Sequence, residues 1–250
     1  MIIDAHAHFG IMDGRSVSSK QFVETLDIYG ISKSCVSSAE ALSYCAETGN
    51  NSVLALMKQY PKRIIGFCVP NPYQQPLKEV KRCIKAGFKG IKLHPWGNDC
   101  FLSSSRYTPV FEEAEAKGIP ILFHSGGTLK VPDFKHATPE MIFSVAERFP
   151  QLKMLIGHMG LERWKEMVER VVPYKNLYLD ITMSMPHPDR INIAVQNVGA
   201  ERVIFGTDMT LLDPAIPLGL MQGSKISDEE KELILGGNIM RLLNMEEKNN

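Results

Sequence analysis

The sequence lacks an excess of charge of either sign and lacks long apolar runs. Its 250 residues include 28 Lys and Arg against 28 Asp and Glu, so the formal net charge is zero. That balance argues against electrostatic binding of nucleic acid or an anionic membrane. No run approaches the 18 or so apolar residues of a spanning helix, and no basic segment with a following apolar stretch suggests a signal peptide. We therefore expect a cytoplasmic protein.

Paired cysteines and glycine-rich nucleotide motifs are also missing. The five cysteines form an odd, scattered set with no Cys-x-x-Cys, which favours reduced thiols in the cytoplasm and argues against a zinc ribbon. A doubly wound open sheet needs a phosphate-binding glycine-rich turn after its first strand. The segment His8-Phe9-Gly10-Ile11-Met12 is not such a turn, so that fold is the less favoured alternative.

What the sequence does contain is an alternation of short apolar and longer amphipathic runs, repeated eight times. The predicted strands cover residues 2–9, 33–39, 63–70, 90–95, 120–126, 153–160, 176–184 and 202–209. The predicted helices cover residues 19–29, 48–60, 76–86, 105–117, 139–149, 162–172, 189–198 and 228–244. About 31 residues per unit matches a closed eightfold barrel. We predict an α/β fold: one (β/α)8 TIM-type barrel, in a distorted form, spanning residues 1–250. The segment 211–226, rich in Pro and Gly, is expected to be irregular and part of the eighth loop.

A His-x-His sequence lies in the first predicted strand. Side chains alternate along a strand, so His6 and His8 project from the same face, about 7 Å apart along the chain. With 7 His in the chain, this spacing would arise by chance about 0.2 times, so the motif alone is weak. Two neutral imidazoles on one face can nevertheless bind one ion.

Other ligand-type residues end later apolar runs: His94, His124, His158 and Asp208. In a (β/α)8 barrel the carboxyl ends of all strands meet at one face, where active sites lie. Five of the seven histidines are thus expected at that face. A divalent ion held by His6, His8, His124 and Asp208 would have an N/O ligand set that suits zinc, with manganese or iron as alternatives. Lys92 and His94 share a strand face, and Trp96 follows them, so we assign these three to substrate binding.

These pieces together resemble the amidohydrolase superfamily, and more closely its amidohydrolase-related branch of aminocarboxymuconate-semialdehyde decarboxylase-like enzymes. The matching segments are Ile-Asp-Ala-His6-Ala-His8, Gly-Ile-Lys92-Leu-His94-Pro, Phe-His124-Ser-Gly, Ile-Gly-His158-Met-Gly and Phe-Gly-Thr-Asp208, followed by Gly237-Asn238 near the C-terminus. Their order covers essentially the whole chain. The resemblance implies a distorted barrel with one or two divalent metals and hydrolytic or decarboxylating chemistry on small molecules.

The resemblance also implies roles for particular residues. His6, His8 and His124 are similar to the metal ligands of strands one and five, and Asp208 to the strand-eight Asp that binds metal and transfers a proton. His158 is similar to a strand-six His that is a second metal ligand or a catalytic residue. The role of Lys92 stays open. Relatives with two metal ions carry a carboxylated lysine at this position, whereas the branch with one ion has no such lysine. We expect one ion rather than two.

A bound metal lowers the pKa of water toward 7, which makes hydroxide available. Asp208 would act as general base and His158 would hold the water or protonate a leaving group. We predict a metal-dependent hydrolase of a small ester, lactone or amide, with a non-oxidative decarboxylase of a small carboxylic acid as the alternative. A noncatalytic ligand-binding barrel would leave Asp208 and His158 without a role. We expect a small-molecule substrate, no nucleic-acid or membrane partner, and a homodimer.

Overall fold

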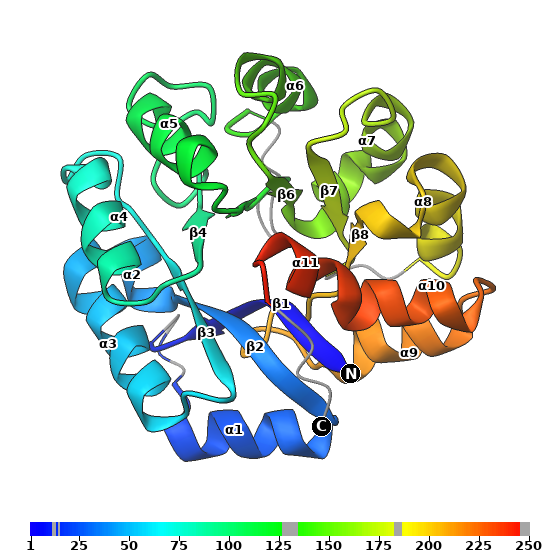
Figure 1. The fold of residues 1–250 in the computed structure, drawn as a ribbon, viewed down its shortest axis with the longest axis horizontal. Coiled ribbons are helices and arrows are strands. Elements are labelled where there is room, and N and C mark those ends of the chain that lie inside the picture. The colour runs from blue at the N-terminus through cyan, green and yellow to red at the C-terminus, as the bar shows by residue number, and fades with distance from the viewer. Residues whose placement is uncertain (12–13, 15, 127–134, 183–186, 246–250) are drawn as a thin grey trace.

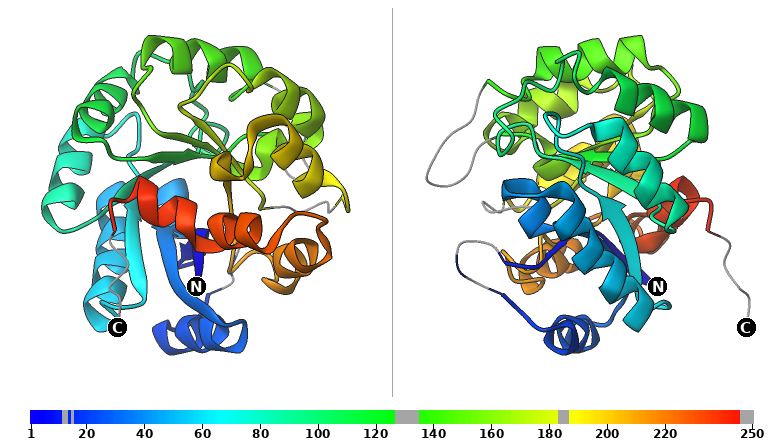
Figure 2. Two further views of the ribbon diagram at one scale, coloured as in Figure 1. Left: turned by 45° about the vertical axis from the view of Figure 1, so that its right-hand side comes forward. Right: turned by 90° about the vertical axis from the view of Figure 1, so that its left-hand side faces the viewer.

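Eight parallel strands form a single sheet in which every strand pairs with its neighbour in sequence (Figure 1). The computed structural model describes residues 1–11, 14, 16–126, 135–182 and 187–245. The strands are β1 (Ile2–Phe9), β2 (Ile31–Ser38), β3 (Ile64–Cys68), β4 (Gly90–Leu93), β5 (Ile121–Phe123), β6 (Met154–Ile156), β7 (Leu177–Asp180) and β8 (Val203–Ile204). Helices surround them on the outside (Figure 2). The predicted eightfold barrel is confirmed.

The sheet closes on itself through a short contact between β1 and the chain that follows β8. The Ala5 amide donates to the Phe205 carbonyl at 3.0 Å, and the Asp208 amide donates to the His6 carbonyl at 2.7 Å. An isolated parallel bridge joins Ala7 to Met209. These bonds, rather than a regular β8–β1 ladder, bring His6 and Asp208 together at the seam.

The helices largely follow the predicted ranges. They are α1 (Ser19–Ile28), α2 (Ala39–Ser43), α3 (Ala46–Gln59), α4 (Pro76–Lys85), α5 (Thr108–Lys117), α6 (Pro139–Arg148), α7 (Trp164–Arg170), α8 (Arg190–Val198), α9 (Ala215–Gly223), α10 (Asp228–Glu232) and α11 (Asn238–Leu242). The Thr138 side chain caps α6 by accepting from the Met141 amide, and Pro139 occupies the first turn, where no intrahelical amide bond is lost.

The structure differs from prediction at several element ends. The segment 211–226 is not irregular throughout, because it contains α9, whose Pro217 lies in the first turn and is tolerated there. The last helix is interrupted by a π-helical turn, η3 (Leu233–Gly237), between α10 and α11. The later strands are shorter than predicted, and residues 183 and 184 of the predicted strand 176–184 lie outside the described residues.

The inside of the barrel is apolar at one end and polar at the other. Ile3, Phe67, Leu155 and Ile204 form a buried cluster inside the barrel with Ile239 of α11. Buried polar side chains, including His6, Lys92, His158 and Asp180, lie in the second half of their strands or just beyond them. The chemistry-bearing residues therefore gather at one face, as the barrel topology predicts. Among the described residues, no helix is long and apolar enough to cross a membrane.

Candidate metal centre

Three predicted ligands meet where the sheet closes. One ligand atom each from His6, His8 and Asp208 lies within 4.8 Å of the others, and all three residues are buried. Asp208 Oδ1 is 3.1 Å from His8 Nε2 and 3.6 Å from His6 Nε2. The alternation of β1 places both imidazoles on the inner face, and the seam with the chain after β8 supplies the carboxylate.

The other ring nitrogen of each β1 histidine is fixed by a neighbouring strand. His6 Nδ1 lies 2.7 Å from Asp180 Oδ2, at the end of β7, and His8 Nδ1 lies 2.9 Å from Ser37 Oγ of β2. Such contacts set the ring orientation and leave Nε2 on the side of Asp208. Both histidines therefore present Nε2 to Asp208.

Asp180 is the residue that sequence reasoning underrated. Its carboxylate also accepts from the Thr182 hydroxyl at 2.6 Å and from the His158 amide at 3.3 Å. A Cβ on Gly206 would lie 2.4 Å from Asp180 Oδ1, so only glycine allows this approach. The signal available in the sequence is an acidic residue that ends an apolar strand, and this signal does not identify a partner.

Asp4 lies deeper in the barrel and braces the seam. Its carboxylate accepts from the His6 amide at 2.9 Å, from the Thr207 hydroxyl at 2.7 Å and from the Thr207 amide at 3.0 Å. The Ser34 hydroxyl adds a fourth contact at 3.1 Å. Asp4 thus fixes the backbone at His6 and at Thr207, the residue before Asp208.

The remaining two predicted ligands lie beside this group rather than within it. His158 Nε2 is 3.1 Å from His124 Nδ1, and the rings of His6 and His158 are centred 5.0 Å apart. Of the described residues, the group within 4.8 Å holds only His6, His8 and Asp208. Within the part of the chain that the structure describes, His124 Nε2 and His158 Nδ1 are buried without a hydrogen-bond partner. Buried polar atoms are rarely left unpaired, so this pair of nitrogens fits a site that receives an ion or a substrate.

Lys92 lies inside the barrel, not at its rim. Its side chain is fully buried and its Nζ is 2.6 Å from His6 Nε2. Burial lowers the pKa of Lys92 to about 8, although the charges of Asp208 and Asp180 act in the opposite direction. Lys92 is therefore not a surface lysine.

His94 and Trp96 continue outward from the centre. The rings of His94 and His124 stack with centroids 4.3 Å apart and an interplanar angle of 9°. His94 Nδ1 accepts from the Gly97 amide at 2.9 Å, and Trp96 lies 5.9 Å from the His94 ring. The three aromatic rings form a row that leads away from the centre.

Electrostatics keep the centre in a state suited to binding a cation. Burial lowers the pKa of all four imidazoles, His6, His8, His124 and His158, and that of His158 falls to about 3. They are neutral at pH 7 and offer lone pairs. Burial by itself raises the pKa of Asp208, but the hydrogen bond with His8 and the neighbouring histidines outweigh it, so the pKa is lowered. The donor set is two to four neutral nitrogens and one carboxylate, which fits a divalent transition metal.

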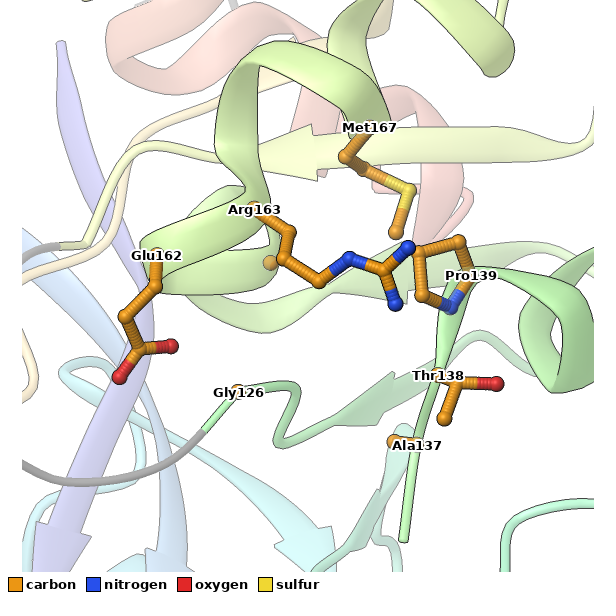
Figure 3. Close-up of a pocket in the computed structure, with 8 residues that line it drawn as sticks. Gly126, Ala137, Thr138, Pro139, Glu162, Arg163 and Met167 are labelled. Atoms are coloured by element: carbon orange, nitrogen blue, oxygen red, sulfur yellow. The ribbon is translucent and has the colours of Figure 1, made fainter. Parts of the chain in front are cut away.

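A narrow pocket is lined by Gly126, Ala137, Thr138, Pro139, Gly160, Glu162, Arg163 and Met167. Gly126 and Gly160 are each two residues beyond a site histidine. Figure 3 shows the Arg163 side chain extended toward Pro139. Arg163 pairs with Glu166 at 2.7 Å, so its charge is already matched within the chain.

Comparisons with known proteins identify similar enzymes. The chain is 22% identical over 250 residues to the gamma-resorcylate decarboxylase of Polaromonas sp., covering 80% of this chain and 76% of that protein. It superposes on 5-carboxyvanillate decarboxylase from Sphingomonas paucimobilis with a TM-score of 0.77 and 16% identity, covering 98% and 99% of the two chains. A dihydroxybenzoic acid decarboxylase from Polaromonas sp. JS666, with bound manganese and an inhibitor, gives a TM-score of 0.78 and 18% identity, covering 97% and 96%.

These comparisons correct the predicted reaction. We predicted a hydrolase of an ester, lactone or amide, and that prediction was wrong, because the relatives are decarboxylases. The ligand set did not distinguish the two reactions, since both place a cation beside a substrate oxygen. The alternative, decarboxylation, is the better supported reaction.

The family prediction is confirmed. A family model described as Amidohydrolase matches residues 3–245, which includes every segment on which the resemblance was based. The two solved decarboxylases named above share the barrel fold with this chain. The chain belongs to the amidohydrolase family.

Proposed function

We propose that this protein is a metal-dependent decarboxylase, a lyase that removes CO2 from a small carboxylic acid. The observation that carries the choice of reaction is that the curated relative and the solved structures described above are decarboxylases. The centre supports it, because neutral imidazoles and an ionised carboxylate lie at the barrel face where chemistry occurs.

His6, His8, His124 and Asp208 would hold one ion, with His158 beside it. Zinc is the first candidate for these N/O donors, with manganese and iron as alternatives; one solved relative holds manganese. When bound, the ion would supply positive charge that attracts the substrate carboxylate and stabilises negative charge developing on the carbon. The unpartnered His124 Nε2 and His158 Nδ1 support this assignment.

The reaction needs one proton, which water supplies and the chain must place. Decarboxylation breaks the C–C bond to the carboxylate, releases CO2 and leaves an electron pair on carbon that takes up a proton. Asp208 and His158 are the candidates to relay that proton from water, since both lie at the centre and the lowered pKa of each leaves it without an acidic proton at pH 7. Lys92, whose buried ammonium lies 2.6 Å from His6, would attract the anionic substrate, and the row of His94 and Trp96 would pack against its apolar part.

The experiment is a screen of aromatic and aliphatic carboxylic acids against protein reconstituted with zinc, manganese or iron. CO2 release is measured directly, and a run in D2O tests whether one deuterium enters the product at the former carboxyl carbon. The matched control is the His6→Ala, His8→Ala double variant loaded in the same way. Ester, lactone or amide cleavage without CO2 release from any acid would contradict the proposal. Homodimer formation and a cytoplasmic location stay predictions.

A further inference from the structure

We infer that Arg190 is a positioning residue: its buried guanidinium fixes the backbone of residues 158–161 and thereby sets where the His158 imidazole lies. Arg190 belongs to α8, one βα unit after the strand that carries His158, and neither sequence pattern nor family resemblance singled it out. The inference rests on the proposed function in one respect, namely that His158 acts at the centre.

The chain leaves β6 in an unfavourable backbone conformation. His158, Met159, Gly160 and Leu161 have φ angles of 60°, 51°, 86° and 47°. Three of these four are not glycine, and non-glycine residues rarely adopt left-handed φ values. Contacts from outside the segment must therefore hold it.

Arg190 supplies such contacts, two to the turn and one to the helix that follows it. One terminal nitrogen donates to the His158 carbonyl, and Nε lies 3.1 Å from Met159 Sδ. The guanidinium also lies 5.5 Å from the ring of Trp164, where α7 begins. Arg190 is 1% exposed and is the largest fully buried side chain of the described residues. One planar group thus contacts the first two residues of the turn and the first residue of the helix that follows it.

The charge of Asp180 partly offsets the burial of the Arg190 guanidinium. Burial lowers the pKa of Arg190, whereas the charge of Asp180 raises it. Asp180 Oδ2 in turn accepts from the His158 amide at 3.3 Å. The His158 backbone is therefore held on both sides, by the Asp180 carboxylate at its amide and by Arg190 at its carbonyl.

This arrangement requires a fork of donors, not only a positive charge. The guanidinium is planar and donates in several fixed directions, whereas a lysine ammonium is a point charge on a flexible stem. Arg190→Lys keeps the charge and removes the fork. Arg202 provides a matched control, because it is also buried and donates to the carbonyls of Val171, Val172 and Tyr174, remote in sequence from the site histidines.

The test follows the histidine rings directly. Long-range 1H–15N spectra of the metal-free protein report the ring nitrogens of the seven histidines, and His158→Gln and His124→Gln assign the two signals of interest. Arg190→Lys and Arg190→Gln are measured in parallel, and circular dichroism checks that each variant is folded. Two variants are made so that a folded one is available for comparison with the wild type. We expect the His158 and His124 signals to move in these variants and to stay in place in Arg202→Lys.

Activity gives the second readout. A shift of a catalytic group by about 1 Å can cost on the order of 100-fold, so kcat for CO2 release should fall by roughly 10- to 100-fold with KM nearly unchanged. Unmoved His158 and His124 signals in a folded Arg190 variant would overturn the inference, even if the wild type is a decarboxylase. If the signals move but the wild type decarboxylates no acid, the positioning role stands and the proposed function fails.

Discussion

At the scale of single residues, the centre is defined by what each imidazole nitrogen contacts. His6 and His8 have Nδ1 engaged by Asp180 and Ser37, and both direct Nε2 toward Asp208. Lys92 Nζ also lies 2.6 Å from His6 Nε2. His124 and His158 share a contact, and each has one buried nitrogen without a partner among the described residues. The orientation of the candidate ligands therefore depends on side chains that are not candidate ligands themselves.

Asp208→Asn should reduce turnover by about 10² to 10⁴, because the amide keeps the shape and one oxygen but cannot transfer a proton at neutral pH. Metal content, measured by elemental analysis, should fall much less, since the histidines remain. The comparison uses the best acid from the substrate screen. If the variant keeps more than about a tenth of wild-type turnover, Asp208 is not the proton-transfer residue, and His158 is next.

Gly206→Ala should loosen metal binding without unfolding the protein. The added Cβ would lie 2.3 Å from Thr182 Oγ1, 2.4 Å from Asp180 Oδ1 and 2.8 Å from His6 Cβ, so Asp180 must move away from His6. Loss of such a supporting contact typically costs about 10- to 100-fold in metal affinity. Affinity is measured by competition with a chromophoric chelator.

The matched control for that change is Gly219→Ala in α9, where an added Cβ meets nothing within 4 Å. Equal affinities in the wild type and both variants would refute the role given to Asp180.

At the scale of elements, the C-terminal helices close the amino end of the barrel. η3 and α11 contact β1 and β8, and Ile239 and Leu242 join the apolar cluster inside the barrel. Asn238 ties this segment to the strands, because its side-chain amide donates to the carbonyls of Ala200 and Val203, each at 2.8 Å. The closing segment and the site therefore lie at opposite ends of the same strands.

Gly236→Ala should destabilise the fold, since an added Cβ would lie 2.4 Å from the Met1 carbonyl oxygen and would push η3 away from β1. We expect a loss of about 1–3 kcal/mol in the free energy of unfolding, the usual cost of overpacking. Gly237→Ala is the control, because its Cβ would meet its nearest neighbours at 3.5 and 3.6 Å, which is ordinary contact. The free energy of unfolding of the two variants is measured by urea denaturation. Equal midpoints for the two variants would contradict close packing of η3 against the start of β1.

At the scale of the whole molecule, metal binding and folding should be coupled. The candidate ligands come from strands at opposite ends of the sequence, β1 and the chain after β8, and adjoin His124 and His158 from β5 and β6. An ion held there would connect the seam of the barrel. Any ligand that binds only the folded state adds stability according to its concentration and affinity.

Removal of the metal should lower Tm. Free metal at about 1,000 times Kd stabilises by about 4 kcal/mol, which corresponds to roughly 10 °C for a chain of this size. Thermal unfolding is followed with and without a strong chelator. The His6→Ala, His8→Ala double variant should show no such difference; a chelator effect of the same size in that variant would place the metal elsewhere.

The sequence by itself determined the repeat and the face on which chemistry lies. Period-two alternation placed His6 and His8 on one side of β1, whose bounds coincide with the predicted range, and strand ends located His124, His158 and Asp208. Strand alternation and strand ends are local properties, which can be identified from neighbouring residues in the sequence. Sequence reasoning therefore predicted the barrel, the family and the residues gathered at its carboxyl end.

Only the tertiary structure decided which of these residues meet. The contact between His6 and Asp180 spans 174 positions, and Arg190 reaches His158 across 32. The burial of Lys92 likewise depends on the other strands that enclose it. Pairing across the barrel is set by strand register and by the seam between β1 and the chain after β8, and neither leaves a periodic signal in the sequence.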